Sequence, residues 1–418
     1  MNKKTLVMLL ALVMIFGVFA TSCGQKPAET ETPETETESE ETTTVDSSLP
    51  GFERGNVLTV GGTSPDGVFN PILYSTVYDG YICELVYDSL LSNDESGSLI
   101  TDYSLTESFE QNEDLTEFVF HLRDGIKWHD GEAFTAEDVA FTFNTIAKPD
   151  YTGRSYTDGF ANIVGAQDVK DGKAETISGI EVVDPLTVKV NMIEPRANNL
   201  YTTAISIIPK HVFDGMTFDQ MSEKSREPIG TGAFKLVKYQ PEQFVELAKN
   251  EEYWNTVPSI DGVIYKVVPE QDILSELQVG TIDAASFSSS IDNYNKVDSA
   301  DFQHLELINK MNNGYSYAAF NFKNLALQDK NVRQALTYAL DRHGFVNTFF
   351  GEKGGFVCHT PISPVSWAYP NMDDMNQYEF NKEKAIELLE EAGWVLPEGK
   401  TVREKDGVPL KFTWVSYN

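Results

Sequence analysis

The stretch that decides the fold is Phe118 to Asn144, which reads FVFHLRDGIKWHDGEAFTAEDVAFTFN. Its first residues, FVFHLR, place Phe118, Phe120 and Leu122 at every second position, between Val119, His121 and Arg123, which is the period of a half-buried β-strand. Two Asp-Gly turn dipeptides flank the IKWH segment, so a hairpin-like structure should follow that strand. Thr135 then precedes Asp138 by three residues, a capping-box variant that predicts the start of an apolar helix, and Pro149 limits its length. The sequence therefore predicts a strand, a hairpin and a helix in succession.

Working outward, apolar strands and amphipathic helices alternate along the rest of the chain, a mixture that indicates an α/β fold. About 360 residues follow position 56, enough for two or three domains. Strands are predicted at 58–62, at 180–191 as a pair joined by Asp184-Pro185, at 229–247 as a glycine-rich turn with two strands, and at 264–268; helices are predicted at 82–91, from Pro209, and at 273–280.

The N-terminus has the three regions of a secretory signal in order. Two lysines precede an apolar run from Leu6 to Ala20, and small residues lead to Cys23. Residues 1–22 are therefore predicted to be a signal peptide. The ending ATSC resembles a bacterial lipobox, which implies cleavage before Cys23 and lipid attachment to its sulfur. The alternative is an ordinary cleaved signal that leaves Cys23 as a free thiol.

Residues 23–56 are predicted to form an acidic disordered tether. Between Gln25 and Pro50 there are eight acidic residues and one lysine but almost no apolar side chains. Such a segment buries too little surface to offset the entropy of ordering it.

The whole chain carries a net charge of −32, of which about −25 lies outside this tether. A protein body this acidic is a poor partner for nucleic acid or for anionic lipid headgroups. The chain has three cysteines. With Cys23 lipidated, Cys83 and Cys358 remain, and two buried thiols are expected rather than a disulfide scaffold.

No catalytic spacing is present in the sequence. The G-x-S-x-G, H-E-x-x-H, Walker and G-x-G-x-x-G patterns are all missing, so no enzymatic activity and no cofactor are expected. The six histidines lack metal-ligand spacing, and the Cys358-His359 pair alone rarely forms a site, so no metal site is predicted. The turn Gly230-Thr231-Gly232 could hold an anion, but a strand-entry turn that needs glycine explains it better.

Several segments taken together resemble one family. The opening stretch resembles the signature segment of the family 5 solute-binding proteins of ABC transporters, which bind oligopeptides, dipeptides or nickel complexes. Further similar segments follow in the family's order and extend the match over Val57 to Asn418: IGTGAFKL at 229–236, NEEYW at 250–254, ELQVGTIDAA at 276–285, YAAFNFKN at 317–324, VRQALTYALDR at 332–342 and FNKEKAIELLEEAGW at 380–394.

The resemblance implies a two-lobe α/β fold of the type II periplasmic-binding-protein kind. It places a first lobe at 57–270, with an extra subdomain at about 92–178, and a second lobe at 271–418. The chain ends within the strand-like segment KFTWVSYN. The resemblance therefore implies an incomplete second lobe, and it places the aspartate that pairs with a peptide's amino terminus beyond residue 418.

The function implied by the resemblance is capture of a peptide outside the membrane and its delivery to an ABC permease. The protein would act as a monomer, lipid-anchored on the extracytoplasmic face of the cell membrane. The alternatives are nickel-chelate or glycan binding on the same scaffold, or, in another class, an extracellular hydrolase or adhesion protein. Ligand sites of this kind are apolar walls with a few placed polar groups. The candidate ligand-binding residues lie on four segments: Tyr74, Tyr78, Arg154, Tyr156, Thr231, Trp367 and Tyr369.

Overall fold

The computed structural model describes residues 51, 54–300, 304–311 and 313–415. The predicted signal peptide, Cys23 and most of the predicted tether lie outside the described residues. The end of that tether is attached to folded structure, because Arg54 forms an ion pair with Asp283 and the Asn56 side chain donates to the Ser259 carbonyl over 2.6 Å. The ordered chain therefore includes residues 54–56, ahead of the predicted lobe boundary.

The chain divides into two compact units. Unit 1 contains the described residues up to Phe287 together with 304–305, and unit 2 contains 288–300 and the described residues from Glu306 onward. Residues 271–287, which were predicted to open the second lobe, thus belong to unit 1.

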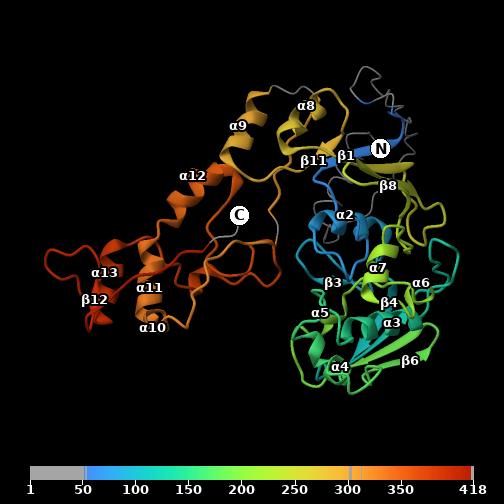
Figure 1. Cartoon of the computed structure of the whole chain (residues 1–418), viewed down its shortest axis with the longest axis horizontal. Helices are drawn as coiled ribbons and strands as arrows, with labels where there is room; N and C mark the ends of the chain where they lie inside the picture. The colour runs from blue at the N-terminus through green and yellow to red at the C-terminus, as the bar shows by residue number, and fades with distance from the viewer. Residues whose placement is uncertain (1–50, 52–53, 301–303, 312, 416–418) are drawn as a thin grey trace, which may run out of the picture. The chain divides into compact units, whose positions relative to one another are not determined.

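A mixed sheet forms one end of unit 1 (Figure 1). Its strand order is β11 (Ala284–Ala285), β1 (Val57–Gly62), β10 (Gly262–Val267), β9 (Phe244–Lys249) and β8 (Phe234–Gln240). Strand β1 runs parallel to β10 and β11, while the β10–β9 and β9–β8 pairs are antiparallel. The predicted strands are confirmed, as is the helix closed by Gly280, which is α8 (Ile273–Gln278).

The helix predicted at 82–91 is displaced in the structure. Helix α2 runs from Val77 to Val86, capped by Thr76, whose hydroxyl accepts from the Asp79 N–H over 3.2 Å. The backbone then turns extended, and the Leu90 N–H donates to the Ile205 carbonyl over 2.9 Å. Apolar residues continue past the end of the helix to Leu91 because both parts are buried, so hydrophobicity alone could not locate the boundary.

A second, antiparallel sheet lies at the other end of unit 1 (Figure 1). Its order is β4 (Thr106–Gln111), β5 (Glu117–Leu122), β7 (Thr187–Asn191) and β6 (Ile180–Asp184). Strands β6 and β7 are the predicted pair joined at Asp184-Pro185, and because β7 pairs with β5 the subdomain extends beyond residue 178. Helix α3 (Ala136–Ala147) packs on this sheet. The remaining elements of this region are β2 (Ser92–Asn93), β3 (Leu99–Ile100), α4 (Ala166–Lys170), α5 (Asn199–Thr203), α6 (Lys210–Phe213) and α7 (Phe218–Lys224).

The opening stretch folds as predicted. Lys127 and Ala133 form an antiparallel bridge, and the two Asp-Gly turns place their glycines at φ +77° and +97°, where a glycine is favoured. Asp138 completes the capping box. Its buried carboxylate accepts from the N–H of Thr135 over 3.0 Å and from the N–H of Lys210 over 2.9 Å. The signature segment therefore links strand β5, helix α3 and the start of α6.

One large hydrophobic core runs through unit 1, with Phe118, Phe120, Phe143 and Trp128 among its buried members. The described residues of unit 2 form two small buried clusters. Its elements are α9 (Ile291–Ser299), α10 (Leu325–Gln328), α11 (Lys330–Ala339), α12 (Arg342–Gly354), α13 (Lys382–Glu391), β12 (Glu404–Lys405) and β13 (Val408–Pro409).

The strand predicted at 411–418 is not formed in its described part, residues 411–415. A strand requires a hydrogen-bonded neighbour, and none of the described strands pairs with this segment. Trp414 and Val415 are accordingly exposed.

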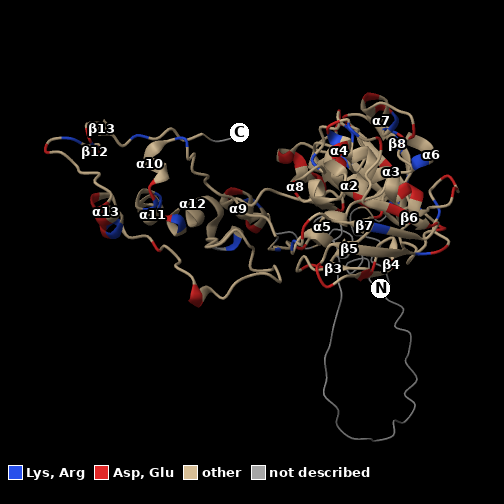
Figure 2. Cartoon of the chain, turned by 90° about the horizontal axis from the view of Figure 1, so that it is seen from below, with Lys and Arg blue, Asp and Glu red and all other residues tan. Residues whose placement is uncertain are grey.

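Acidic residues are spread over both units rather than collected on one element (Figure 2). The described part of the chain includes no helix that is long and apolar enough to span a membrane.

Candidate functional site

The loop before α2 is held in place by one buried carboxylate. Asp79 accepts hydrogen bonds from the backbone N–H groups of Asp66, Gly67 and Val68 over 2.8–3.1 Å, and from the Thr76 hydroxyl. Four donors on one carboxylate fix residues 66–68 against the first turn of α2. This places the predicted loop residues Tyr74 and Tyr78 on a rigid support.

Two of the predicted segments meet beside α2. The Arg154 guanidinium lies 3.9 Å from the centre of the Tyr74 ring, a cation–π contact. The Tyr151 hydroxyl donates to the Ile72 carbonyl over 2.6 Å, and a Cβ on Gly153 would lie 2.7 Å from that oxygen. Glycine at 153 therefore lets the two backbones approach. The structure brings Tyr74 and Arg154 together, with Arg154 exposed.

Tyr78 and Tyr156 have different neighbours. The Tyr78 ring meets the Tyr81 ring edge-on on α2, with 6.3 Å between ring centres. The Tyr156 hydroxyl donates to the Gln167 side chain over 3.2 Å, and Lys170 Nζ lies 5.0 Å from the ring centre. These contacts show Tyr156 packed within the subdomain.

Thr231 is buried, and its hydroxyl donates to the Asp88 carboxylate over 2.9 Å. Trp254 Nε1 and the Tyr253 hydroxyl donate to the same carboxylate over 2.8 and 3.1 Å. Burial raises the pKa of Asp88, while these hydrogen bonds oppose that rise. Thr231 therefore contributes to a buried network inside unit 1.

The flanking glycines are needed for close approach. A Cβ on Gly230 would lie 1.8 Å from the Val86 carbonyl oxygen. His129 fastens the same turn, because its Nδ1 accepts from the Gly230 N–H over 3.2 Å and its Nε2–H donates to the Gly232 carbonyl over 2.9 Å. Burial first, and the charge of Lys235 in addition, lower the pKa of His129 to about 4. The opening stretch thus holds the Gly-Thr-Gly turn in place through the hydrogen bonds of the neutral His129 imidazole.

An open depression of about 590 Å³ lies elsewhere on unit 1 and contains none of the predicted ligand residues. The Arg123 guanidinium lies 5.3 Å from the centre of the Trp254 ring in its wall. No local sequence signal marks this depression, because its walls come from strand β4 and from separate loops: Asp102, Tyr103, Glu107, Arg123, Asp124, Ile126, Trp254 and Asn255. With three carboxylates around one arginine it is less suited to an apolar ligand than the surface at Tyr74.

Trp367 and Tyr369 lie on an irregular loop of unit 2. Trp367 is 62% exposed and Tyr369 is half-buried. The loop is shaped by consecutive turns, in which Ser366 N–H donates to Ser363 O over 2.9 Å and Tyr369 N–H donates to Ser366 O over 3.0 Å. An exposed indole on a turn-rich loop can contact a ligand.

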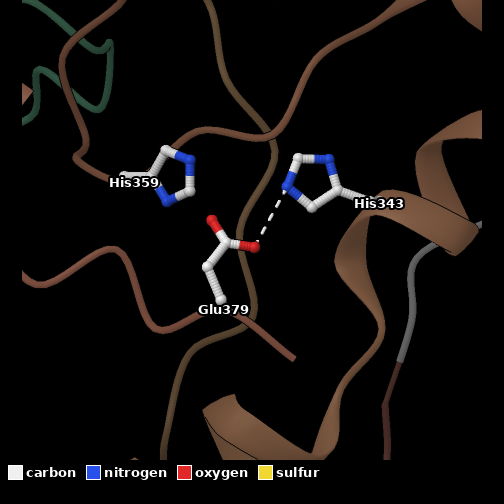
Figure 3. A group of neighbouring side chains, drawn as sticks. All are labelled: His343, His359 and Glu379. Carbon is white, nitrogen blue, oxygen red and sulfur yellow. Dashed lines mark ion pairs between the residues drawn. The ribbon is translucent and has the colours of Figure 1, made fainter. Parts of the chain in front are cut away.

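The structure also gathers three potential metal ligands that the sequence separates. The donor atoms of His343, His359 and Glu379 all lie within 4.8 Å of one another, and Figure 3 shows the two rings and the carboxylate directed toward one another. His343 Nε2 is 3.5 Å from Glu379 Oε2.

Neither Cys83 nor Cys358 forms a disulfide. Cys83 is buried as expected, but Cys358 is half-exposed because it lies on an irregular segment, so that expectation was wrong.

Solved structures similar to this chain define its class as extracellular solute-binding proteins with the type II periplasmic-binding-protein fold. The oligopeptide-binding protein AppA from Bacillus subtilis, in complex with a nonapeptide, is similar with a TM-score of 0.65, 28% identity, and coverage of 84% of this chain and 67% of that one. NikZ from Campylobacter jejuni, in complex with Ni(L-His), is similar with a TM-score of 0.66 and 28% identity, and the match covers 87% of this chain and 67% of the NikZ chain.

The sequence comparisons agree. The family model described as bacterial extracellular solute-binding proteins, family 5 middle, matches residues 102–418. The chain belongs to this family. The curated oligopeptide-binding protein AppA of Bacillus subtilis is 29% identical over 99% of this chain, and the dipeptide-binding protein of Escherichia coli is 31% identical over 79%. The chain spans 71% and 62% of the length of these two relatives, respectively.

Proposed function

We propose that this protein captures peptides outside the cytoplasm and presents them to an ABC permease without cleaving them. The observation that carries the proposal is the similarity to an oligopeptide-binding protein over 99% of the chain. The Tyr74–Arg154 pair supports it locally. Arg154 is exposed and belongs to no ion pair among the described residues, so its guanidinium can meet a peptide carboxylate while Tyr74 offers an aromatic surface.

The test is peptide affinity by calorimetry, with variants that remove one contact each. Arg154→Ala and Trp367→Ala should each weaken binding by about 1–3 kcal/mol if they contact the peptide. Arg196→Ala is a matched control, because Arg196 is also a partly exposed arginine of unit 1 but is paired with Glu194 at 3.1 Å. Affinities equal to that of the parent in both variants would remove these residues from the site.

The proposed attachment to the membrane uses lipid on Cys23. One acyl chain holds only weakly, at about 0.8 kcal/mol per buried CH₂, so stable attachment requires more than one chain. Cys23→Ala should therefore release the protein into the medium. Continued sedimentation of the variant with membranes would contradict lipid attachment.

A second candidate cargo is a nickel chelate, favoured by the similarity to NikZ with Ni(L-His). Competition distinguishes the two, because a site that takes peptide alone should keep its bound peptide when Ni²⁺ and free histidine are added. Displacement of bound peptide by Ni(L-His) would favour the nickel chelate.

A further inference from the structure

Two imidazoles and one carboxylate meet in unit 2, and this is a ligand set typical of zinc sites that keep an open position. Tetrahedral zinc holds its nitrogen and oxygen ligands at about 2.0–2.2 Å, which places donor atoms about 3.3 Å apart. The His343–Glu379 pair, at 3.5 Å, already has this separation. The third donor lies within 4.8 Å of both, so rotation of side chains that are partly or fully exposed can close the site.

His359 is oriented by a hydrogen bond away from the cluster. Its Nδ1 lies 2.9 Å from the Gln377 carbonyl oxygen. A carbonyl only accepts, so Nδ1 carries the hydrogen and the Nε2 lone pair is left for a ligand. Such a hydrogen bond to a metal-binding histidine sets its tautomer and ring orientation.

Arg342 joins the three chain segments that carry the ligands. Its guanidinium donates to the carbonyls of Cys358, Gln377 and Tyr378 over 3.2, 2.6 and 3.0 Å. Arg342 precedes His343, Cys358 precedes His359, and Tyr378 precedes Glu379. The backbone of the cluster is therefore assembled by hydrogen bonds before any ion binds.

We propose that His343, His359 and Glu379 bind one divalent transition-metal ion of the zinc class, with water completing the coordination. Two nitrogens and an oxygen suit Zn²⁺ better than a soft monovalent ion such as Cu⁺. Glu379 offsets one of the two positive charges of the ion. The proposal does not rest on the peptide cargo proposed above, because the protein's own side chains hold this ion.

The test is titration of the chelator-treated protein with ZnSO₄ in competition with a chromogenic chelator. We expect one equivalent of Zn²⁺ to bind, and His343→Gln, His359→Gln and Glu379→Gln each to weaken that binding at least tenfold. His121→Gln is the matched control, because His121 also lies 3.5 Å from a glutamate, Glu110, but has no third ligand in the described residues. It should bind zinc like the parent protein.

Co²⁺ provides a second readout of the same site. The Co²⁺-loaded parent should show visible absorption of tetrahedral intensity, and His359→Gln should lose it. Thermal unfolding of the metal-free variants checks that they fold. The proposal is overturned if the parent binds no zinc, or if all three variants bind it as tightly as the His121→Gln control.

Discussion

His129 makes a pH-dependent contribution to stability whose size follows from its lowered pKa, which is caused first by burial of the ring. Nδ1 accepts from Gly230 and Nε2–H donates to Gly232, so the folded protein requires the neutral ring. The folded pKa of about 4 lies below the unfolded value of 6.5, and the unfolded chain therefore binds more protons between these two values. The contribution is complete above pH 6.5 and is lost as pH falls through 4, amounting to at most about 3 kcal/mol.

The assay is urea unfolding of the parent and of His129→Gln between pH 7 and pH 4. Gln does not titrate, so the parent should be the more stable protein at pH 7 and its advantage should shrink toward pH 4. Lys235→Met serves as an independent check, since removing that charge should raise the pKa of His129, observable by NMR. A stability difference between parent and His129→Gln that stays constant over this range would refute the reasoning.

Three further outcomes follow from the packing. Gly230→Ala should lower the free energy of unfolding, measured by thermal unfolding, by about 3 kcal/mol or more, because the added Cβ would collide with the Val86 carbonyl. Gly125→Ala, which meets nothing within 4 Å but has φ +77°, should cost only about 1 kcal/mol, and equal losses would contradict the close-approach argument. Asp79→Ala should lower the free energy of unfolding in urea by about 2–4 kcal/mol, because it leaves several backbone N–H groups without an acceptor. An unchanged free energy of unfolding would show that water replaces the carboxylate. Limited proteolysis should leave a fragment ending near residue 287, since the large core lies in unit 1, whereas uniform digestion would contradict that contrast.

Local signals were sufficient for much of the fold. The Asp-Gly turns, the Thr135–Asp138 capping box and the Asp184-Pro185 hairpin depend on residues within a few positions of one another, and the structure confirms them. The helix predicted at 82–91 was displaced because the segment that follows α2 is extended and its Leu90 pairs with residue 205, which no local pattern reveals.

The sites depended on long-range contacts and were less predictable. The sequence showed that the Tyr74 loop and the Arg154 segment are both rich in aromatic residues. The contact between Tyr74 and Arg154 depends on the Tyr151–Ile72 hydrogen bond, which joins the two segments and which the sequence did not show. The sequence showed no metal-ligand spacing, because the ligands of the cluster at His359 lie on separate segments of the chain. Hydrogen bonds from Arg342 hold these segments together.

The most direct test of the proposed function is mass spectrometry of what the purified protein carries and retains. The protein should release peptides on denaturation, then bind members of a defined peptide pool stoichiometrically and leave them intact. Recovery of no peptide together with no binding from the pool, or the appearance of saturable cleavage products, would contradict the account.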